Sequence, residues 1–170
     1  MKKAIFLFFL LISSFSFGQL EGKLSAFDAF DSNIGATIKI VKSTDYTIKL
    51  SGDSGKLEQI IWNVSDETLK IRSGMADIDY GQVHVIIHTP NIDSVKLTNG
   101  GSLHMDDAFS KMEHFQVSAV DNALVDLSNI DFRNLTATAT DGGHILYGST
   151  RNLVSTTTDA GEVRRAEGIN

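Results

Sequence analysis

The sequence contains no cysteine and a single proline, and only 8% of its 170 residues are aromatic. Without cysteine the chain can form no disulfide, offers no thiolate nucleophile and cannot carry the lipid that bacterial lipoproteins attach to an N-terminal cysteine. It also has no Gly-x-Ser-x-Gly elbow and no phosphate-binding loop. Stability must therefore come from packing and from backbone pairing.

Basic residues are also scarce, with 15 Lys and Arg against 21 Asp and Glu, which gives a formal net charge of −6. Nucleic acids and anionic lipid surfaces are bound through basic patches. An acidic chain of this kind is not expected to bind either of them.

The only long apolar run is at the beginning of the chain. Lys2 and Lys3 precede the apolar stretch 4–12, and a Ser/Phe-rich stretch follows that ends Ser16-Phe17-Gly18, with small residues at the positions a signal peptidase reads. The run is too short to span a bilayer, so the pattern predicts a signal peptide over residues 1–18, cleaved before Gln19. Its removal leaves 13 basic and 21 acidic residues, a formal charge of −8. We expect residues 19–170 to form one domain that is periplasmic, cell-surface or secreted, with no transmembrane segment.

Strand-like alternation of apolar and polar residues dominates the rest of the chain. It recurs in residues 36–42, 46–50, 69–72 and 82–89, where Pro90 ends the last run. Helical spacing occurs only over residues 56–61. The sequence therefore predicts an all-β fold, with an irregular β-rich leading half.

A repeat of about 20 residues begins near residue 95. One apolar position recurs at Val95, Phe115, Leu135 and Leu153, and an Asn- or Asp-led corner follows each copy. These corners are Asn99-Gly100-Gly101, Asp121-Asn122-Ala123, Asp141-Gly142-Gly143 and Asp159-Ala160-Gly161. Such spacing is typical of a β-solenoid, in which each rung buries its apolar face against the next. Since Asn99-Gly100 is also a hairpin signal, an antiparallel sandwich is the competing interpretation.

Alternation within the repeats assigns side chains to the interior or to the surface. The inward positions become smaller along the chain and are Val95, Leu97, Phe115, Val117, Ala119, Leu135, Ala137, Ala139, Leu153, Ser155 and Thr157. The outward positions include hydroxyl residues expected to stack in one column, namely Thr98, Ser118, Thr138 and Thr156. This column is the candidate interaction surface, and a polymer or ice lattice is one candidate ligand.

The order of these elements resembles the head GIN domain family, which carries the label of putative auto-transporter adhesin and occurs mainly in exported proteins of Bacteroidetes-type bacteria. The resemblance rests on the following segments: residues 24–30, the strands at Ala36 and Tyr46, Gly52-Asp53, residues 69–71, residues 85–90 and the Gly/Asp corners. It implies a right-handed parallel β-helix-like solenoid at the envelope, without established catalytic residues. Two corners, Asp121-Asn122-Ala123 and Asp159-Ala160-Gly161, depart from the Ser-Gly-Ser-Gly corners typical of the family.

No constellation in the sequence predicts a catalytic or metal site. His84 and His88 share a strand face but lie too far apart along it to bind one metal ion. The corner aspartates are explained by turn geometry, although calcium between rungs stays an alternative. The aromatic residues suited to stacking on sugars do not gather on one face; they are Tyr46, Trp62, Tyr80 and Tyr147.

The sequence thus predicts an exported, non-enzymatic adhesion or interaction module without cofactor, whose partner is an envelope or extracellular polymer or protein. Two alternatives stay open beside it. One is a polysaccharide-processing β-helix enzyme, and the other is a stack that assembles end to end through its terminal strands.

Overall fold

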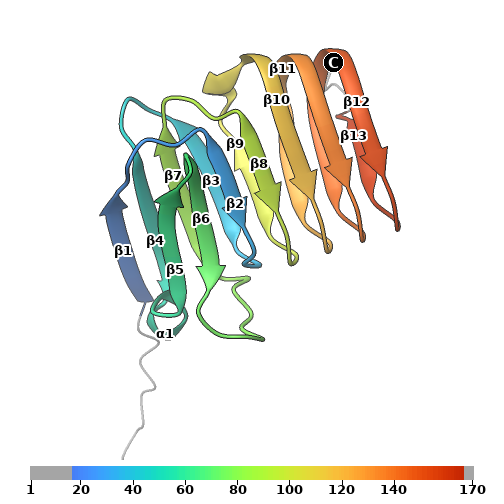
Figure 1. Cartoon of the computed structure of the whole chain (residues 1–170). Helices are drawn as coiled ribbons and strands as arrows, with labels where there is room; N and C mark the ends of the chain where they lie inside the picture. The colour runs from blue at the N-terminus through green and yellow to red at the C-terminus, as the bar shows by residue number, and fades with distance from the viewer. Residues whose placement is uncertain (1–16, 167–170) are drawn as a thin grey trace, which may run out of the picture.

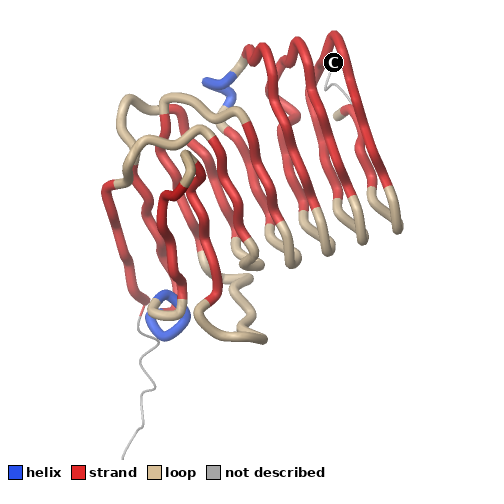
Figure 2. Tube along the Cα trace, in the orientation of Figure 1, coloured by secondary structure: helices blue, strands red, loops and turns tan. Residues whose placement is uncertain are grey.

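The computed structural model describes residues 17–166, which are mostly β-strand, so the all-β prediction is confirmed. Figures 1 and 2 show two rows of strands facing each other, which we call the front layer (toward the viewer) and the back layer. In sheet order the back layer contains β1 (Phe17–Lys23), β4 (Thr47–Asp53), β7 (His84–Thr89), β3 (Thr37–Lys42), β9 (Ser102–Met105), the first parts of β11 (Leu124–Ala139) and β12 (His144–Thr157), and β13 (Glu162–Arg165). The front layer contains β5 (Ile60–Ser65), β6 (Thr68–Ser73), β2 (Ala29–Ser32), β8 (Ser94–Leu97), β10 (Lys111–Ala119) and the second parts of β11 and β12.

Helical structure within residues 17–166 is limited to two short turns. The turn α1 (Ser54–Leu57) is capped by Asp53, whose carboxylate accepts a hydrogen bond of 3.0 Å from the Lys56 amide. A 3₁₀ turn (Asp107–Phe109) lies between β9 and β10. Helical spacing over residues 56–61 therefore marked a real turn, but placed it two residues too late.

Pairing between neighbouring strands is parallel through most of the structure. In the front layer β6, β2, β8, β10, β11 and β12 pair in parallel in this order. β8 and β9 flank the Asn99-Gly100 corner, yet each pairs with strands from other rungs. The hairpin interpretation of this corner is therefore wrong. Antiparallel pairs occur at the leading end, between β1 and β4, β4 and β7, and β5 and β6.

The core is built from side chains that stack in register across the strands. One column in the back layer is fully buried and consists of Leu50, Val85, Ile38, Leu103, Val125 and Ile145. The matching front column runs through Leu69, Phe30, Val95, Val117, Ala137 and Ser155, and its side chains become smaller toward the C-terminal end. Each large apolar side chain buried this way contributes roughly 1.5–3 kcal/mol to stability.

The last rung departs from the predicted interior. Leu153, Ser155 and Thr157 occupy inward positions of β12, but all three are exposed, and Leu153 is 39% accessible. In the preceding rung Leu135, to which Leu153 is paired, is only 1% exposed. The second part of β12 pairs with β11 on one edge, but β13 pairs with residues 144–147 of β12 only, so among residues 17–166 no strand pairs with the other edge of this part. The alternation was correct, but within the described residues no further rung covers this one.

The corners adopt the left-handed conformation that their residues favour. Two successive residues have positive φ at each corner, for example 62° and 69° at Asn99-Gly100 and 50° and 74° at Asp141-Gly142. Consecutive corners are joined through the backbone, since the amide of Gly100 donates to the carbonyl of Asp121 at 2.8 Å and the amide of Gly142 to that of Asp159 at 2.9 Å. The corner residues thus serve backbone geometry and inter-rung pairing.

Most of the expected signal peptide, residues 1–16, lies outside the described residues. Phe17 and Gly18 form the first two pairs of β1 with Asp53 and Gly52. Cleavage before Gln19 would leave the other five pairs of β1 intact. Within residues 17–166 the structure contains no helix long and apolar enough to span a membrane.

Candidate functional surface

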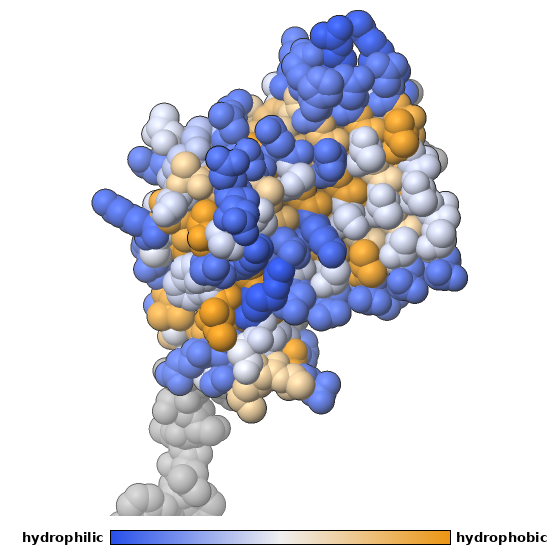
Figure 3. All heavy atoms as spheres, viewed as in Figure 1, coloured by the Kyte–Doolittle hydropathy of each residue, from blue (hydrophilic) through white to orange (hydrophobic). Residues whose placement is uncertain are grey.

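The outward face of the front layer carries a straight row of polar side chains across six strands. Strand register aligns, in order, Lys70, Asp31, Lys96, Ser118, Thr138 and Thr156. Neighbouring members are one strand spacing apart, about 4.8 Å. Figure 3 shows the hydroxyl half of this row as a pale field over β10, β11 and β12, with strongly hydrophilic side chains at its upper corner. We call the six residues the outward row.

Thr98 does not belong to this row, which corrects the predicted column. Ser118 pairs with Lys96, and Val117 rather than Phe115 pairs with Val95. Thr98 lies beyond the end of β8, where its amide donates to the Ser32 carbonyl at 3.0 Å. The remaining members Ser118, Thr138 and Thr156 are in register as expected.

Lys96 takes the place predicted for Thr98 because the first repeat is longer than the second. Asn99 and Asp121 are 22 residues apart, whereas Asp141 follows Asp121 by 20. The segment between β9 and β10 holds the 3₁₀ turn, with Asp106 as its cap. Counting from corner to corner would have found the correct register, because the corners stack on one another.

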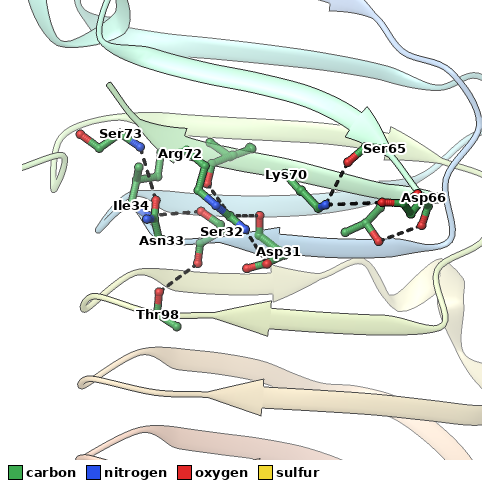
Figure 4. Close-up of polar contacts among 12 residues, drawn as sticks. Asp31, Ser32, Asn33, Ile34, Ser65, Asp66, Lys70, Arg72, Ser73 and Thr98 are labelled. Carbon is green, nitrogen blue, oxygen red and sulfur yellow. Dashed lines mark hydrogen bonds and ion pairs between the residues drawn. The ribbon is translucent and has the colours of Figure 1, made fainter. Parts of the chain in front are cut away.

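The charged end of the outward row is fixed by ion pairs and hydrogen bonds (Figure 4). The Arg72 guanidinium contacts Asp31 through both of its terminal nitrogens. Nη2 lies 2.5 Å from the Asp31 carboxylate, and Nη1 donates to the Asp31 backbone carbonyl at 2.8 Å. Lys70 donates to the Ser65 hydroxyl at 2.9 Å and lies 3.9 Å from Asp66. The pairing of Arg72 with Asp31 neutralises the one carboxylate of the row.

The hydroxyl end is a shallow hollow of about 220 Å³. The side chains that border it are polar, namely Ser94, Lys96, Gln116, Ser118, Thr136 and Thr138, with Val95 and Val117 beneath them. Ser118 and Thr138 are half-buried and Thr156 is exposed. The hollow can form hydrogen bonds with a ligand that lies across the strands, but it has no deep cavity that would enclose a small molecule.

The histidines on the back layer contact side chains on neighbouring strands. His104 lies 3.2 Å from Asp126, His144 lies 3.1 Å from Glu162, and His88 is within 3.1 Å of the Thr47 hydroxyl. The alternation of residues along single strands could not reveal these cross-strand pairs. Within residues 17–166 no three histidine or acidic side chains converge closely enough to hold a metal ion. Calcium between rungs stays an untested alternative.

On the outward face of the back layer, the carboxylate of Asp126 is held in its ionised form by several contacts. Burial raises its pKa, but hydrogen bonds from Ser128 and the contact with His104 outweigh this effect, so the pKa is lowered overall. The Ser128 amide donates to the carboxylate at 3.0 Å. This arrangement joins β9 to β11 electrostatically and needs no catalytic role to explain it.

A larger hollow, of about 860 Å³, is lined by the loop of residues 73–81. Its walls include Asn33, Asn99 and the loop residues Asp77 and Asp79. Several wall groups are already engaged with each other, since Asn99 donates to the Asn33 carbonyl at 2.8 Å and Ser73 lies 2.7 Å from the Tyr80 hydroxyl. The sequence did not single out this hollow, because the residues that line it come from separate segments of the chain.

Several solved structures share this fold. A protein described as a putative adhesin from Bacteroides fragilis superposes with a TM-score of 0.71 at 15% identity, over 88% of this chain and 73% of its own. A putative lipid binding protein from Parabacteroides distasonis superposes with a TM-score of 0.72 at 16% identity, over 88% of this chain and 65% of its own. A putative adhesin from Parabacteroides merdae superposes with a TM-score of 0.67 at 14% identity, over 82% of this chain and 57% of its own. The chain thus spans less than two thirds of the length of the two Parabacteroides proteins, and these identities establish a shared fold only.

A family model provides the assignment that these distant structures cannot. No curated protein matches the chain. The model described as "Putative auto-transporter adhesin, head GIN domain" matches residues 26–168, which is most of the sequence. The chain belongs to the head GIN domain family.

Proposed function

We propose that the protein is an exported, non-enzymatic adhesion or interaction module of the bacterial cell envelope, folded as a right-handed parallel β-solenoid over residues 19–170. Family membership and the predicted signal peptide support the location and the general role. The parallel ladders and stacked corners support the solenoid.

The observation that carries the functional part is the outward row on the front layer. Its hydroxyl end presents Ser118, Thr138 and Thr156 at regular spacing on one sheet, whose inward side chains beneath Ser118 and Thr138 are buried. A rigid polar array loses little conformational entropy when it binds an extended partner. The face therefore suits a repetitive polymer better than a small substrate.

The test compares the two outward faces of the molecule. Purified protein would be titrated onto cells of the source bacterium and onto an array of glycans and matrix proteins. The double variant Ser118→Leu/Thr138→Leu removes two hydroxyls without changing charge. Thr37→Leu is the matched control, because Thr37 is exposed on the back layer. We expect the front variant to weaken binding at least fivefold and the control to change it less than twofold.

Two results would overturn the proposal. One is the absence of any partner on cells and arrays, together with unchanged adherence of a deletion strain. The other is turnover of a polysaccharide that is lost in a corner variant such as Asp141→Asn, which would establish the enzymatic alternative.

A further inference from the structure

Basic side chains outnumber acidic ones along one part of the front face, although the whole chain carries −6. Three shallow hollows follow one another there, since the hydroxyl hollow shares Gln116 with a second of about 440 Å³, and the second shares Lys111 and Glu113 with a third of about 340 Å³. We call this continuous surface the front track. Five basic side chains line it, Lys42, Lys96, Lys111, Arg133 and Arg151, against the three acidic side chains Asp93, Glu113 and Asp131.

Within the described part of the chain, most of the five basic side chains of the front track have no ion pair or hydrogen bond, whereas two of its three acidic side chains do have a partner. Glu113 is paired with Arg133 at 3.0 Å, and Asp131 accepts a hydrogen bond from the Ser149 hydroxyl. Lys96, Lys111 and Arg151 are exposed, and among residues 17–166 their side chains form no ion pair and no hydrogen bond. Three free cations therefore lie along a surface that also carries hydroxyl and amide side chains, namely Asn91, Ser94, Gln116, Ser118, Thr136 and Thr138.

This combination selects one class of partner by its chemistry. Free cations attract carboxylate or sulfate groups, and the Ser, Thr and Gln side chains between them can both donate to and accept from hydroxyl groups. A single-stranded nucleic acid would call for exposed aromatic rings on which bases stack, but the phenylalanines in these hollows, Phe109, Phe115 and Phe132, are at most 4% exposed. A protein partner would call for exposed apolar or aromatic anchors, but apart from Met112 the apolar side chains that line these hollows are at most 4% exposed.

We propose that the front track binds an acidic polysaccharide, whose anionic groups contact Lys96, Lys111 and Arg151 and whose sugar hydroxyls contact the outward row at Ser118 and Thr138. The inference rests on the proposed adhesion function and names the ligand class for it. Because the cations are exposed, each contact is weak and is screened by salt. Binding strength must then come from several contacts along one polymer chain.

The experiment measures binding of the full purified protein to immobilised polygalacturonate, dextran sulfate and neutral dextran. We expect binding to one or both acidic polymers, none to dextran, and at least a tenfold loss of affinity between 50 and 300 mM NaCl. Lys96→Gln and Lys111→Gln should each weaken binding three- to tenfold. Lys39→Gln is the matched control, since Lys39 is an exposed lysine on the back layer, and it should change affinity less than twofold.

The two acidic polymers separate carboxylate from sulfate recognition. Equal binding to neutral dextran, or an equal loss of affinity in Lys39→Gln, would overturn the inference, and so would capture of DNA in preference to both acidic polymers. Cell binding that polygalacturonate and dextran sulfate fail to compete would also overturn it, while leaving the adhesion function in place. Absence of cell binding would instead count against the adhesion function itself.

Discussion

Gly143 lies where one corner meets the backbone of the rung before it, and it should tolerate no side chain. A Cβ added at this residue would lie 2.1 Å from the Ala119 carbonyl oxygen and 2.5 Å from the Ala119 carbonyl carbon. Since non-bonded heavy atoms pack at about 3.5 Å, the corner would have to move by about 1 Å or more. Both close atoms belong to the backbone, so no side-chain rotation can relieve the contact.

The movement has a cost that the surrounding contacts allow us to estimate. The amide of Thr140 donates to the same Ala119 oxygen at 3.0 Å, and the amide of Gly143 donates to the Thr140 carbonyl at 2.8 Å. Overpacking costs about 1–3 kcal/mol, and each weakened hydrogen bond about 1 kcal/mol. Gly143→Ala should therefore lower the free energy of unfolding by about 3–5 kcal/mol.

Urea denaturation followed by far-ultraviolet circular dichroism measures this loss. Gly100→Ala is the control, because its φ of 69° is unfavourable for alanine, but nothing lies within 4 Å of the added Cβ. The control should lose about 1 kcal/mol. If Gly143→Ala lost no more than Gly100→Ala, the close approach between corner and preceding rung would be refuted as a determinant of the stack.

Local patterns were enough to predict the strands and corners of the second half. Alternation placed Phe115, Val117, Leu135 and Ala137 inward, and all four are buried. The alternation of side chains along a strand and the conformation of a corner both depend on residues close in sequence, because the pleat of a strand and the φ of a corner are set locally. The register between rungs is not local, so two extra residues before β10 were enough to replace Thr98 by Lys96 in the outward row.

The charged end of the candidate surface could not be predicted for the same reason. Asp31 lies between Lys70 and Lys96 because β2 is inserted between β6 and β8, strands that follow it by about 40 and 65 residues in the chain. Nothing in the spacing of the leading half indicates this order. The hydroxyl column followed from the repeat, whereas its basic neighbours required the folded topology.

Three further outcomes can be measured on the same protein. Leu135→Ala should cost about 2–4 kcal/mol of unfolding free energy, but Leu153→Ala less than about 1 kcal/mol, because Leu153 is 39% exposed on the terminal rung; equal losses would show that the last rung is covered. Mass spectrometry of the exported protein should find Gln19 at its amino terminus, and a mature chain that retains residues 1–18 would contradict the predicted signal peptide. Asp126→Asn should lower stability at pH 7, since the native fold stabilises the ionised carboxylate and lowers its pKa. That contribution is present above the unfolded-state pKa of about 4 and is lost as the pH falls through the lower native value. The stability curves of wild type and Asp126→Asn should therefore converge in acid, and a gap that stays constant down to pH 2 would show that the ionised Asp126 carboxylate does not stabilise the fold.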